Sequence, residues 1–291
     1  MSRVPITAIV TAYQRIEQTL ATLEKLRACQ PTPDEILVHV DGNQTQCEAA
    51  IRRAFPEIKV LHSKEPVGPG GGRNKLVAEA KHEFVAGFDD DSYPIDVDYF
   101  ARVVTLFERF SVASVLAAKV YHQGEVVAPG SQTGMWMSDF IGCGCVYRRT
   151  AFLATSGYVP LAVAYGMEEV DLALRLHAQG GKILRTSWLR VFHDTDLKRH
   201  ANREVTAGSI ANLALLAYLR YPPSLWIVGL GQCCNRIVWL LRSGRRLGIL
   251  SGLLMIPQHL SNYRRYRQRM AAEVVRSYLA LRHAPIAAKF D

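Results

Sequence analysis

Three consecutive acidic residues directly follow an apolar, strand-like segment. Asp89, Asp90 and Asp91 come after FVAGF, so their carboxylates are expected at the carboxyl end of a strand. Carboxylates two residues apart can face one divalent cation, and Mg²⁺ or Mn²⁺ held in this way commonly takes further ligands from substrate phosphates. Acidic turns are also common at solvated surfaces, so the run alone favours a metal site and a capped turn about equally.

A second acidic cluster opens a helix-like stretch further along the chain. Glu168 and Glu169 precede Asp171 and the apolar sequence LALRL. Acids in the first turn of a helix often only complement its dipole. A reaction that deprotonates a hydroxyl needs a general base, and Glu169 is our candidate, with Glu168 and Asp171 as alternatives.

A histidine follows a long extended segment over residues 182–193. A histidine in such a place is usually structural, but His193 is flanked by Asp194 and Asp196. A neutral imidazole nitrogen is a good ligand for a divalent cation. We therefore expect His193 to complete a metal site with Asp91 and Asp89.

Alternating strand and helix patterns predict the elements that position these groups. The expected strands are 6–11, 35–40, 59–62 and 84–88, and the expected helices between them are 16–27, 44–55 and 73–81. This alternation predicts βαβ crossovers and an α/β fold with a mainly parallel twisted sheet and helices on both faces. Such sheets bind ligands beyond the carboxyl ends of their strands.

Other side chains are expected at the same edge of the sheet. Thr11, Ala12 and Tyr13 end the first strand, and Asp41 ends the second. Asp41 can accept a hydrogen bond from a nucleobase, although a turn role before Gly42 is almost equally favoured. These strand ends therefore converge on the acidic run.

A glycine-rich segment over residues 68–75 is predicted to lead into a helix. Free backbone amides and a positive helix end favour an anionic phosphate, and Arg73 or Lys75 adds charge. The alternative is a flexible turn. The glycines do not follow the first strand and no GK[ST] ending is present, so neither a dinucleotide fingerprint nor a P-loop is predicted.

The downstream half is predicted to continue the α/β pattern and then to change character. The expected elements are helix 99–110, strand 114–121, loop 126–139, strand 145–147, and helices 149–155, 168–179 and 204–219. The loop carries an exposed-looking Trp136. Trp136 and Glu168 are candidates for binding a second substrate, the one whose hydroxyl would be deprotonated. We expect residues 1–203 to form the catalytic domain and residues 204–291 a basic, amphipathic helical region.

Charge is unevenly distributed along the 291 residues. The net charge is +9, and residues 220–291 hold 12 Lys and Arg against 2 Asp and Glu. Apolar patches alternate there with arginines, and no patch is expected to be long enough to span a membrane. This composition favours docking to an anionic inner leaflet, with a solvated basic helical face or a dimer contact as the alternative.

Cysteine usage and the amino terminus predict a cytoplasmic location, and the basic, amphipathic C-terminal region predicts that the chain is peripheral on the inner face of the cytoplasmic membrane. The six cysteines lack the C-x-x-C spacing typical of zinc sites, so we interpret them as reduced core thiols. The amino-terminal segment runs directly into a strand, and no secretory leader is expected.

In order, these motifs resemble those of the family 2 glycosyltransferases of the GT-A fold, across roughly residues 4–200. The resemblance rests on TAYQR, the strand end at Asp41, GGGRN, the D-x-D pair, FIGCGCVYRR, the Glu168-Glu169 pair and His193. The family usually has Asp where this chain has Glu169.

The resemblance implies a metal-dependent, inverting transfer with Mn²⁺ or Mg²⁺ as cofactor. Asp91, His193 and Asp89 would hold the metal. The nucleotide-sugar would be bound by Thr11, Ala12, Tyr13, Arg15, Asp41, Arg73, Asp89, Asp90, Gly142 and Gly144. The donor would be a UDP- or dTDP-sugar, and the acceptor a hydroxyl of a glycan or lipid-linked molecule in cell-surface polysaccharide synthesis.

Two other function classes fit part of the pattern. Carboxylates with Mg²⁺ also serve metal-dependent phosphohydrolases and nucleotidyltransferases. A basic membrane-surface or nucleic-acid-binding protein would instead need basic residues beyond the C-terminal quarter, so nucleic acid is not an expected partner.

Overall fold

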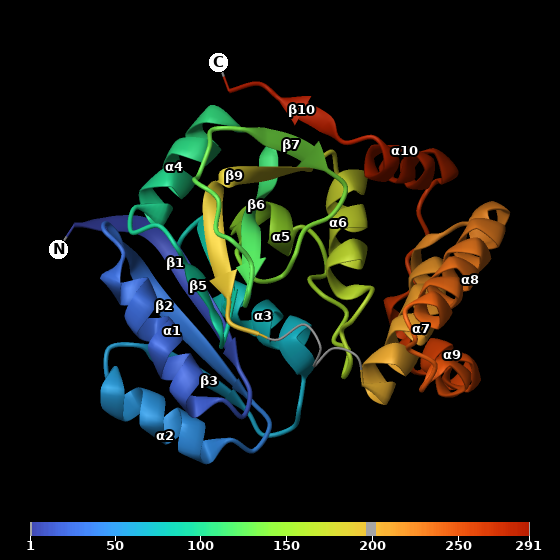
Figure 1. The fold of residues 1–291 in the computed structure, drawn as a ribbon, viewed down its shortest axis with the longest axis horizontal. Helices are drawn as coiled ribbons and strands as arrows, with labels where there is room; N and C mark the ends of the chain where they lie inside the picture. Colours follow the sequence, from blue (N-terminus) through green and yellow to red (C-terminus); the bar gives the residue numbers. More distant parts are fainter. Residues whose placement is uncertain (1, 196–201, 291) are drawn as a thin grey trace.

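The computed structural model describes residues 2–195 and 202–290, and its centre is one large twisted sheet (Figure 1). The strand order is β10-β7-β9-β6-β8-β4-β1-β2-β3, with β5 paired to β9. Strands β3, β2, β1 and β4 run parallel, as do β6 and β9, while β8, β7, β5 and β10 pair antiparallel with their neighbours. The α/β fold class predicted from the sequence is confirmed.

The first half of the chain alternates strands and helices as predicted. Its elements are β1 (Arg3–Ala12), α1 (Ile16–Ala28), β2 (Thr32–Asp41), α2 (Thr45–Ala54), β3 (Lys59–Ser63), α3 (Gly68–Glu79) and β4 (Phe84–Asp89). Alternate residues of β1 enter different cores, because side chains on a strand point to opposite faces: Val10 packs with α1, α2 and α4, whereas Ile9 packs with α3, α5 and α6. Helices therefore cover both faces.

The second half completes the sheet. Its elements are β5 (Ser92–Pro94), α4 (Tyr99–Arg109), β6 (Ala113–His122), β7 (Gly134–Met137), β8 (Cys145–Arg148), α5 (Arg149–Leu153), α6 (Glu168–Ala178) and β9 (Lys182–His193). The loop expected over residues 126–139 instead contains strand β7, which pairs with β9. Trp136 is partly buried there, because its ring packs edge-on against Phe110.

The glycine-rich segment is not a turn before a helix but the first part of helix α3 itself. Pro69 is compatible with a first helical turn, where its missing N–H is not needed. The glycines allow α3 to lie close to the sheet, since a Cβ at Gly72 would stand 2.6 Å from Nδ1 of His39. Close approach, rather than flexibility, explains the glycines.

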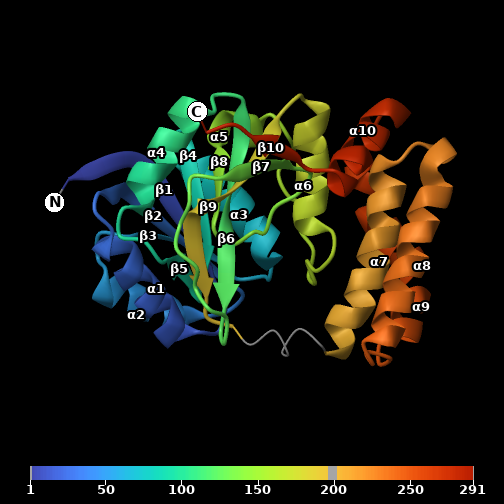
Figure 2. The ribbon, with the colours of Figure 1, turned by 45° about the horizontal axis from the view of Figure 1, so that its top comes forward.

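The C-terminal region is helical and lies beside α6 (Figure 2). It contains α7 (Arg203–Arg220), η2 (Pro223–Leu225), α8 (Trp226–Arg242), α9 (Ile249–Tyr263), η3 (Arg264–Tyr266), α10 (Ala272–His283) and β10 (Ile286–Ala288). Strand β10 pairs with β7 and so returns the chain to the large sheet. The expected boundary at residue 203 coincides with the start of α7, and Asp196 lies outside the described residues.

One described segment meets the length and apolarity needed to cross a membrane. Residues Pro223–Arg242 have a mean hydropathy of 1.3, and 22% of the window is buried inside the protein. The expectation that no patch is long enough was therefore wrong by this criterion, because Asn235 and Arg236 do not lower the mean far enough.

Candidate functional site

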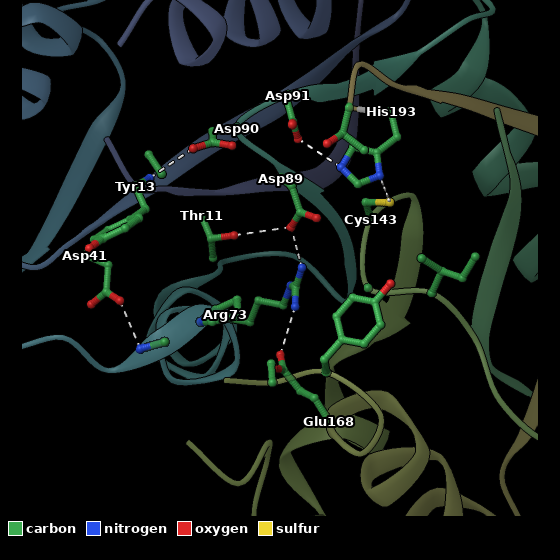
Figure 3. Close-up of a pocket in the computed structure, with 18 of the residues that line it drawn as sticks. Thr11, Tyr13, Asp41, Arg73, Asp89, Asp90, Asp91, Cys143, Glu168 and His193 are labelled. Atoms are coloured by element: carbon green, nitrogen blue, oxygen red, sulfur yellow. Dashed lines mark hydrogen bonds and ion pairs between the residues drawn. The ribbon is translucent and has the colours of Figure 1, made fainter. Parts of the chain in front are cut away.

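A cavity of about 1140 Å³ lies where the carboxyl ends of β1, β2, β4 and β9 meet. It brings together most of the candidate residues named from the sequence, nine of which are labelled in Figure 3 together with Cys143. Lining residues predicted from the sequence are Thr11, Ala12, Tyr13, Arg15, Asp41, Arg73, Asp89, Asp90, Asp91, Gly142, Glu168, Glu169 and His193. The expected convergence of strand ends is thus present.

Arg73 lies at the centre of a buried ion network in this cavity. Its guanidinium pairs with the carboxylate of Asp89 and donates to Oε1 of Glu168 at 2.9 Å. Its side chain is 4% exposed, and its buried Nε has no hydrogen-bond partner among the described residues. Burial lowers the pKa of Arg73, but Asp89 and Glu168 outweigh it and hold the pKa well above its usual value. Arg73 is therefore a fixed positive charge.

Asp91 and His193 form the candidate metal position. Nε2 of His193 lies 3.0 Å from Oδ1 of Asp91, and Arg15 pairs with the other oxygen of that carboxylate. Burial raises the pKa of Asp91, but His193 and Arg15 outweigh it and hold the pKa below its usual value. Asp91 therefore stays ionised at neutral pH.

The residues present fit a divalent cation. Asp89, Cys143 and His193 each offer a ligand atom, and these atoms lie within 4.8 Å of one another, with Asp91 in contact with His193. Carboxylate and imidazole ligands suit Mn²⁺ and are compatible with Mg²⁺ when substrate oxygens complete the shell. Of the three predicted ligands, Asp89 and His193 belong to this group, while Asp91 contacts His193 and pairs with Arg15. Metal binding by these residues stays a prediction.

Cys143 is a cavity residue that sequence reasoning assigned to the core. Its Sγ lies 3.6 Å from Nδ1 of His193, on the side of the ring away from Asp91. Burial raises the pKa of this thiol well above its usual value. The stretch FIGCGC carried a signal, since its glycines were assigned to the site while the cysteine between them was not.

Asp90 organises the loop that follows β1. Its Oδ2 accepts the backbone N–H of Tyr13 at 3.0 Å, and its Oδ1 lies 3.3 Å from Nη1 of Arg15. Burial raises the pKa of Asp90 to about 7. Asp90 thus positions Tyr13 and Arg15 at the cavity wall.

Asp41 holds the entry to helix α3. Its two carboxylate oxygens accept the backbone N–H groups of Val67 and Gly68 at 2.8 and 2.9 Å. The side chain still lines the cavity, and a carboxylate has lone pairs for further donors. These contacts are not the local turn before Gly42 that the sequence suggested, since the donors lie 26 and 27 residues along the chain, and the contact of Asp41 with a nucleobase stays a prediction.

The two glutamates at the start of α6 have different surroundings. Glu168 is fully buried against Arg73, whereas Glu169 is partly exposed and accepts the backbone N–H of Gly142 at 3.1 Å. Burial raises the pKa of both carboxyl groups, with Arg73 acting against it. A Cβ at Gly142 would stand 2.7 Å from Oε1 of Glu169, so the backbone approaches the glutamate closely. Glu169 is the more accessible base.

A match to a protein family covers the part of the chain that holds much of this site. Residues 7–142 match the model of glycosyl transferase family 2. These residues form a family 2 glycosyltransferase domain. The domain holds the D-x-D pair, Arg73 and Gly142, while Glu169 and His193 come from the chain beyond it.

Solved structures with the GT-A fold are similar to the chain that carries this glycosyltransferase domain. The mannosyltransferase PcManGT from Pyrobaculum calidifontis, in complex with GDP-Man and Mn²⁺, has a TM-score of 0.59 and 13% identity over 96% of this chain and 87% of its own. TarS 1–349 from S. aureus, in complex with UDP-GlcNAc, has a TM-score of 0.54 and 14% identity over 90% and 92%. GalNAc-T7 with UDP, GalNAc and Mn²⁺ has a TM-score of 0.59 and 13% identity over 75% and 48%. These likenesses show the fold.

A curated relative matches much of the chain in sequence. The uncharacterized protein y4gI of Sinorhizobium fredii (strain NBRC 101917 / NGR234) is 22% identical over 226 residues, which is 67% of this chain. The chain spans about a quarter of the length of that relative, since the match covers 25% of it.

Two predicted residues lie apart from the cavity of the glycosyltransferase domain. Gly144 is not among the lining residues; its φ of +75° and its contact with Val191 explain the glycine. Trp136 lines a second cavity of about 700 Å³ between β7 and α10, together with Lys182 and Ile286. The structure therefore does not bring Trp136 to Glu168.

Asp171, the alternative base, is fully engaged elsewhere. Its carboxylate accepts hydrogen bonds from Arg175 and from Arg220, and it is 1% exposed and outside the cavity. It cannot reach an acceptor hydroxyl in this arrangement. Further cavity residues outside the sequence motifs are His39, His122, Tyr165 and Glu204. Gln14, Phe140 and Ile141 also line the cavity; they lie within TAYQR and FIGCGCVYRR but were not named individually.

Proposed function

We propose that the chain transfers a sugar from a nucleoside diphosphate sugar to a hydroxyl group of a glycan or lipid-linked acceptor, with inversion at the anomeric carbon. One observation carries this proposal. A single cavity on a family 2 glycosyltransferase domain places the carboxylates of Asp89 and Asp91, the buried cation of Arg73 and the base candidate Glu169 around one space. These residues combine a charged site for the nucleoside diphosphate sugar with a base that can take up the proton of the attacking hydroxyl.

The donor would lie along the ends of β1, β2 and β4. Asp41 and Tyr13 would contact the nucleoside, and the positive charge of Arg73, which lines the cavity, would attract the diphosphate. Asp91 and His193 would hold the Mn²⁺ or Mg²⁺, with Asp89 beside them. When bound, the cation would neutralise the diphosphate and assist its departure.

Glu169 would supply the proton transfer. Its carboxylate is held by Gly142 and faces the cavity, so it can accept the proton of an acceptor hydroxyl as that oxygen attacks the anomeric carbon. The bond to the nucleoside diphosphate breaks on the opposite face of the sugar. A single displacement of this kind inverts the anomeric configuration.

The donor class is supported by the similar structures. PcManGT is described with GDP-Man, and TarS 1–349 with UDP-GlcNAc. We propose a UDP- or dTDP-sugar as donor, with GDP-sugars as the comparison to exclude. The chain would act in the cytoplasm at the inner face of the cytoplasmic membrane, in cell-surface polysaccharide synthesis.

A thermal-shift screen tests this function. Purified protein with Mn²⁺ is heated with UDP, dTDP, GDP, ADP and their sugars. A ligand at a hundredfold excess over its Kd adds about 2.7 kcal/mol, which raises the Tm by roughly 5 °C for a domain of this size. We expect one diphosphate to stabilise the protein only when the metal is present.

Two results together would show that the transferase proposal is wrong. If no nucleoside diphosphate shifts the Tm while inorganic phosphate does, and if simple phosphate esters are hydrolysed without a sugar acceptor, the site is that of a phosphohydrolase and the transferase proposal is wrong.

A further inference from the structure

The turn between α8 and α9 is surrounded by exposed apolar side chains. We call this region the α8–α9 tip and define it as residues 238–254. The most exposed apolar residues within it are Leu247 at 79%, Leu254 at 73% and Leu250 at 70%. Val238, Trp239, Leu241 and Leu253 are also exposed. Such a concentration of exposed large apolar residues marks a contact surface.

Helix α8 extends this surface as a stripe. Ile227, Leu230, Cys234, Val238 and Leu241 recur at helical spacing and are all exposed. The opposite side of α8 is packed, since a Cβ at Gly229 would stand 2.4 Å from Cβ of Ala217 in α7, and Cys233 and Leu240 are buried. Because one side is attached to α7, α8 is suited to lie on an apolar surface rather than to be surrounded by lipid.

The charge beside the apolar residues is uniformly positive. Residues 221–272 contain eight arginines and no aspartate or glutamate. Arg236 and Arg245 lie over the ring of Trp239, at 4.5 and 5.4 Å from its centroid. Arginine stems beside a tryptophan suit an interface where apolar chains meet anionic head groups.

The tip lies close to the mouth of the cavity. Gly248 packs against the backbone carbonyl of Arg203, and Arg203 donates to Oγ of Ser251 at 2.9 Å. The next residue, Glu204, lines the cavity. In Figure 2 the turn between α8 and α9 lies at the same end of the molecule as the ends of β6 and β9, which carry His122 and His193.

Helix α7 connects the tip region to the cavity wall. The side-chain amide of Asn212 donates to the backbone carbonyls of Val163 and Tyr165 at 2.7 and 3.0 Å, and its oxygen lies 2.8 Å from Nε2 of His259 in α9. Tyr165 lines the cavity. The helices that carry the tip therefore also hold part of the wall.

We propose that the α8–α9 tip docks onto an anionic lipid bilayer, with its leucines in the head-group region and its arginines on lipid phosphates, so that the cavity opens toward the membrane. The positive charge selects this partner over a neutral apolar surface. The docking stands independently of the proposed function; only the benefit of facing a lipid-linked acceptor rests on it.

Vesicle flotation tests the docking. The full chain is mixed with vesicles of phosphatidylcholine alone, or with 30% phosphatidylglycerol, and no donor or metal is added. Each arginine near the surface is worth about fivefold in binding, so R242A/R245A/R246A should bind the anionic vesicles on the order of a hundredfold more weakly. The matched control R27A/R53A/K64A removes three exposed positive charges from the α1–α2 side and should bind like the unmodified chain.

The apolar contribution has its own comparison. L250S/L253S/L254S should lose binding to anionic vesicles, whereas V112S/V126S, which changes exposed valines elsewhere, should not. Brominated lipids should quench tryptophan fluorescence in the unmodified chain and in W136F, and much less in W239F.

These outcomes decide the proposal. Binding that needs phosphatidylglycerol, weakens at 0.5 M NaCl and follows the tip residues supports it. It is overturned if the chain fails to float with anionic vesicles at low salt, if the tip variants bind as well as their controls, or if the leucines instead lie between two copies in a dimer that does not bind vesicles. Since no donor is used, each result is separate from the nucleotide screen.

Discussion

Glu168 and Glu169 are neighbours with opposite environments. Oε1 of Glu168 accepts from Arg73, and its Oε2 is buried without a partner among the described residues. Glu169 accepts a hydrogen bond from the backbone N–H of Gly142 and borders the cavity. Their chemistry follows from this difference: Glu168 fixes the charge of Arg73, and Glu169 is available to a substrate.

Replacement of the base should separate chemistry from binding. In Glu169→Gln the carboxylate is lost while the size of the side chain is kept, so kcat should fall by about 10²- to 10⁴-fold. The Kd of the donor should change less than about threefold, since the diphosphate contacts lie elsewhere. Release of nucleoside diphosphate in the presence of acceptor measures kcat, and calorimetry measures the Kd of the donor. Turnover equal to that of the unmodified chain would refute the base assignment.

The burial of the Glu169 carboxyl group also predicts how turnover depends on pH. Burial raises the pKa of Glu169, and the base acts only when ionised. The value of kcat/KM should therefore rise as pH increases through a pKa above that of an ordinary glutamate and level off beyond it. A pH profile between 4 and 9 checks this. If kcat/KM still falls at low pH in the same way in Glu169→Gln, the group that titrates is not Glu169.

The residue types at the strand ends could be predicted from the sequence, but their individual contacts could not. The D-x-D pair and Asp41 lie at strand ends, and parallel strands bring those ends to one edge. Cys143 reaches His193 from a loop before β8, and no pattern of spacing specifies where a loop lies. The lack of C-x-x-C spacing predicted a core thiol; Cys143 is indeed buried, but it also lines the cavity beside His193.

Helix α6 connects the site to the C-terminal helices. Asp171, in the first turn after Glu168 and Glu169, accepts from Arg175 of the same helix and Arg220 at the end of α7. Arg220 also donates to the backbone carbonyl of Tyr266 at 2.9 Å. This buried cluster fixes the helix start that presents the two glutamates.

Loss of Arg220 should therefore destabilise the protein strongly. Arg220→Ala leaves part of a buried carboxylate without its partner, which costs about 3–5 kcal/mol of unfolding free energy. Urea denaturation followed by circular dichroism measures it. The control Arg276→Ala removes an exposed arginine of α10 and should change stability by less than about 0.5 kcal/mol. Equal midpoints for the two variants would show that the cluster does not hold the helices together.

Elements with strong periodicity were predictable, and those that depend on distant partners were not. Helix α1 and strand β3 match their expected ranges closely, because their apolar spacing is local information. Strand β7 forms by pairing with β9, and β10 forms by pairing with β7, from which it is separated by more than a hundred residues in the sequence. The helical start of α3 was missed because glycine propensity opposes it, whereas packing against His39 favours it.

At the scale of the whole molecule, two surfaces meet at one end. The cavity lies at the carboxyl edge of the sheet, and the α8–α9 tip stands near it through Arg203 and Glu204. The uneven charge along the chain was visible in the sequence and predicted a basic region. Its position relative to the cavity follows only from how α7 and α9 pack.

Calorimetric titration of the preferred nucleoside diphosphate, with and without Mn²⁺, tests the central claim most directly. The claim is that Asp91 with His193 forms a metal-assisted diphosphate site, while Glu169 belongs to the chemistry alone. We expect the unmodified chain and Glu169→Gln to bind alike with Mn²⁺, and Asp91→Asn to bind at least about tenfold more weakly. Equal affinity in all three proteins, or affinity unchanged by removal of the metal, would contradict it.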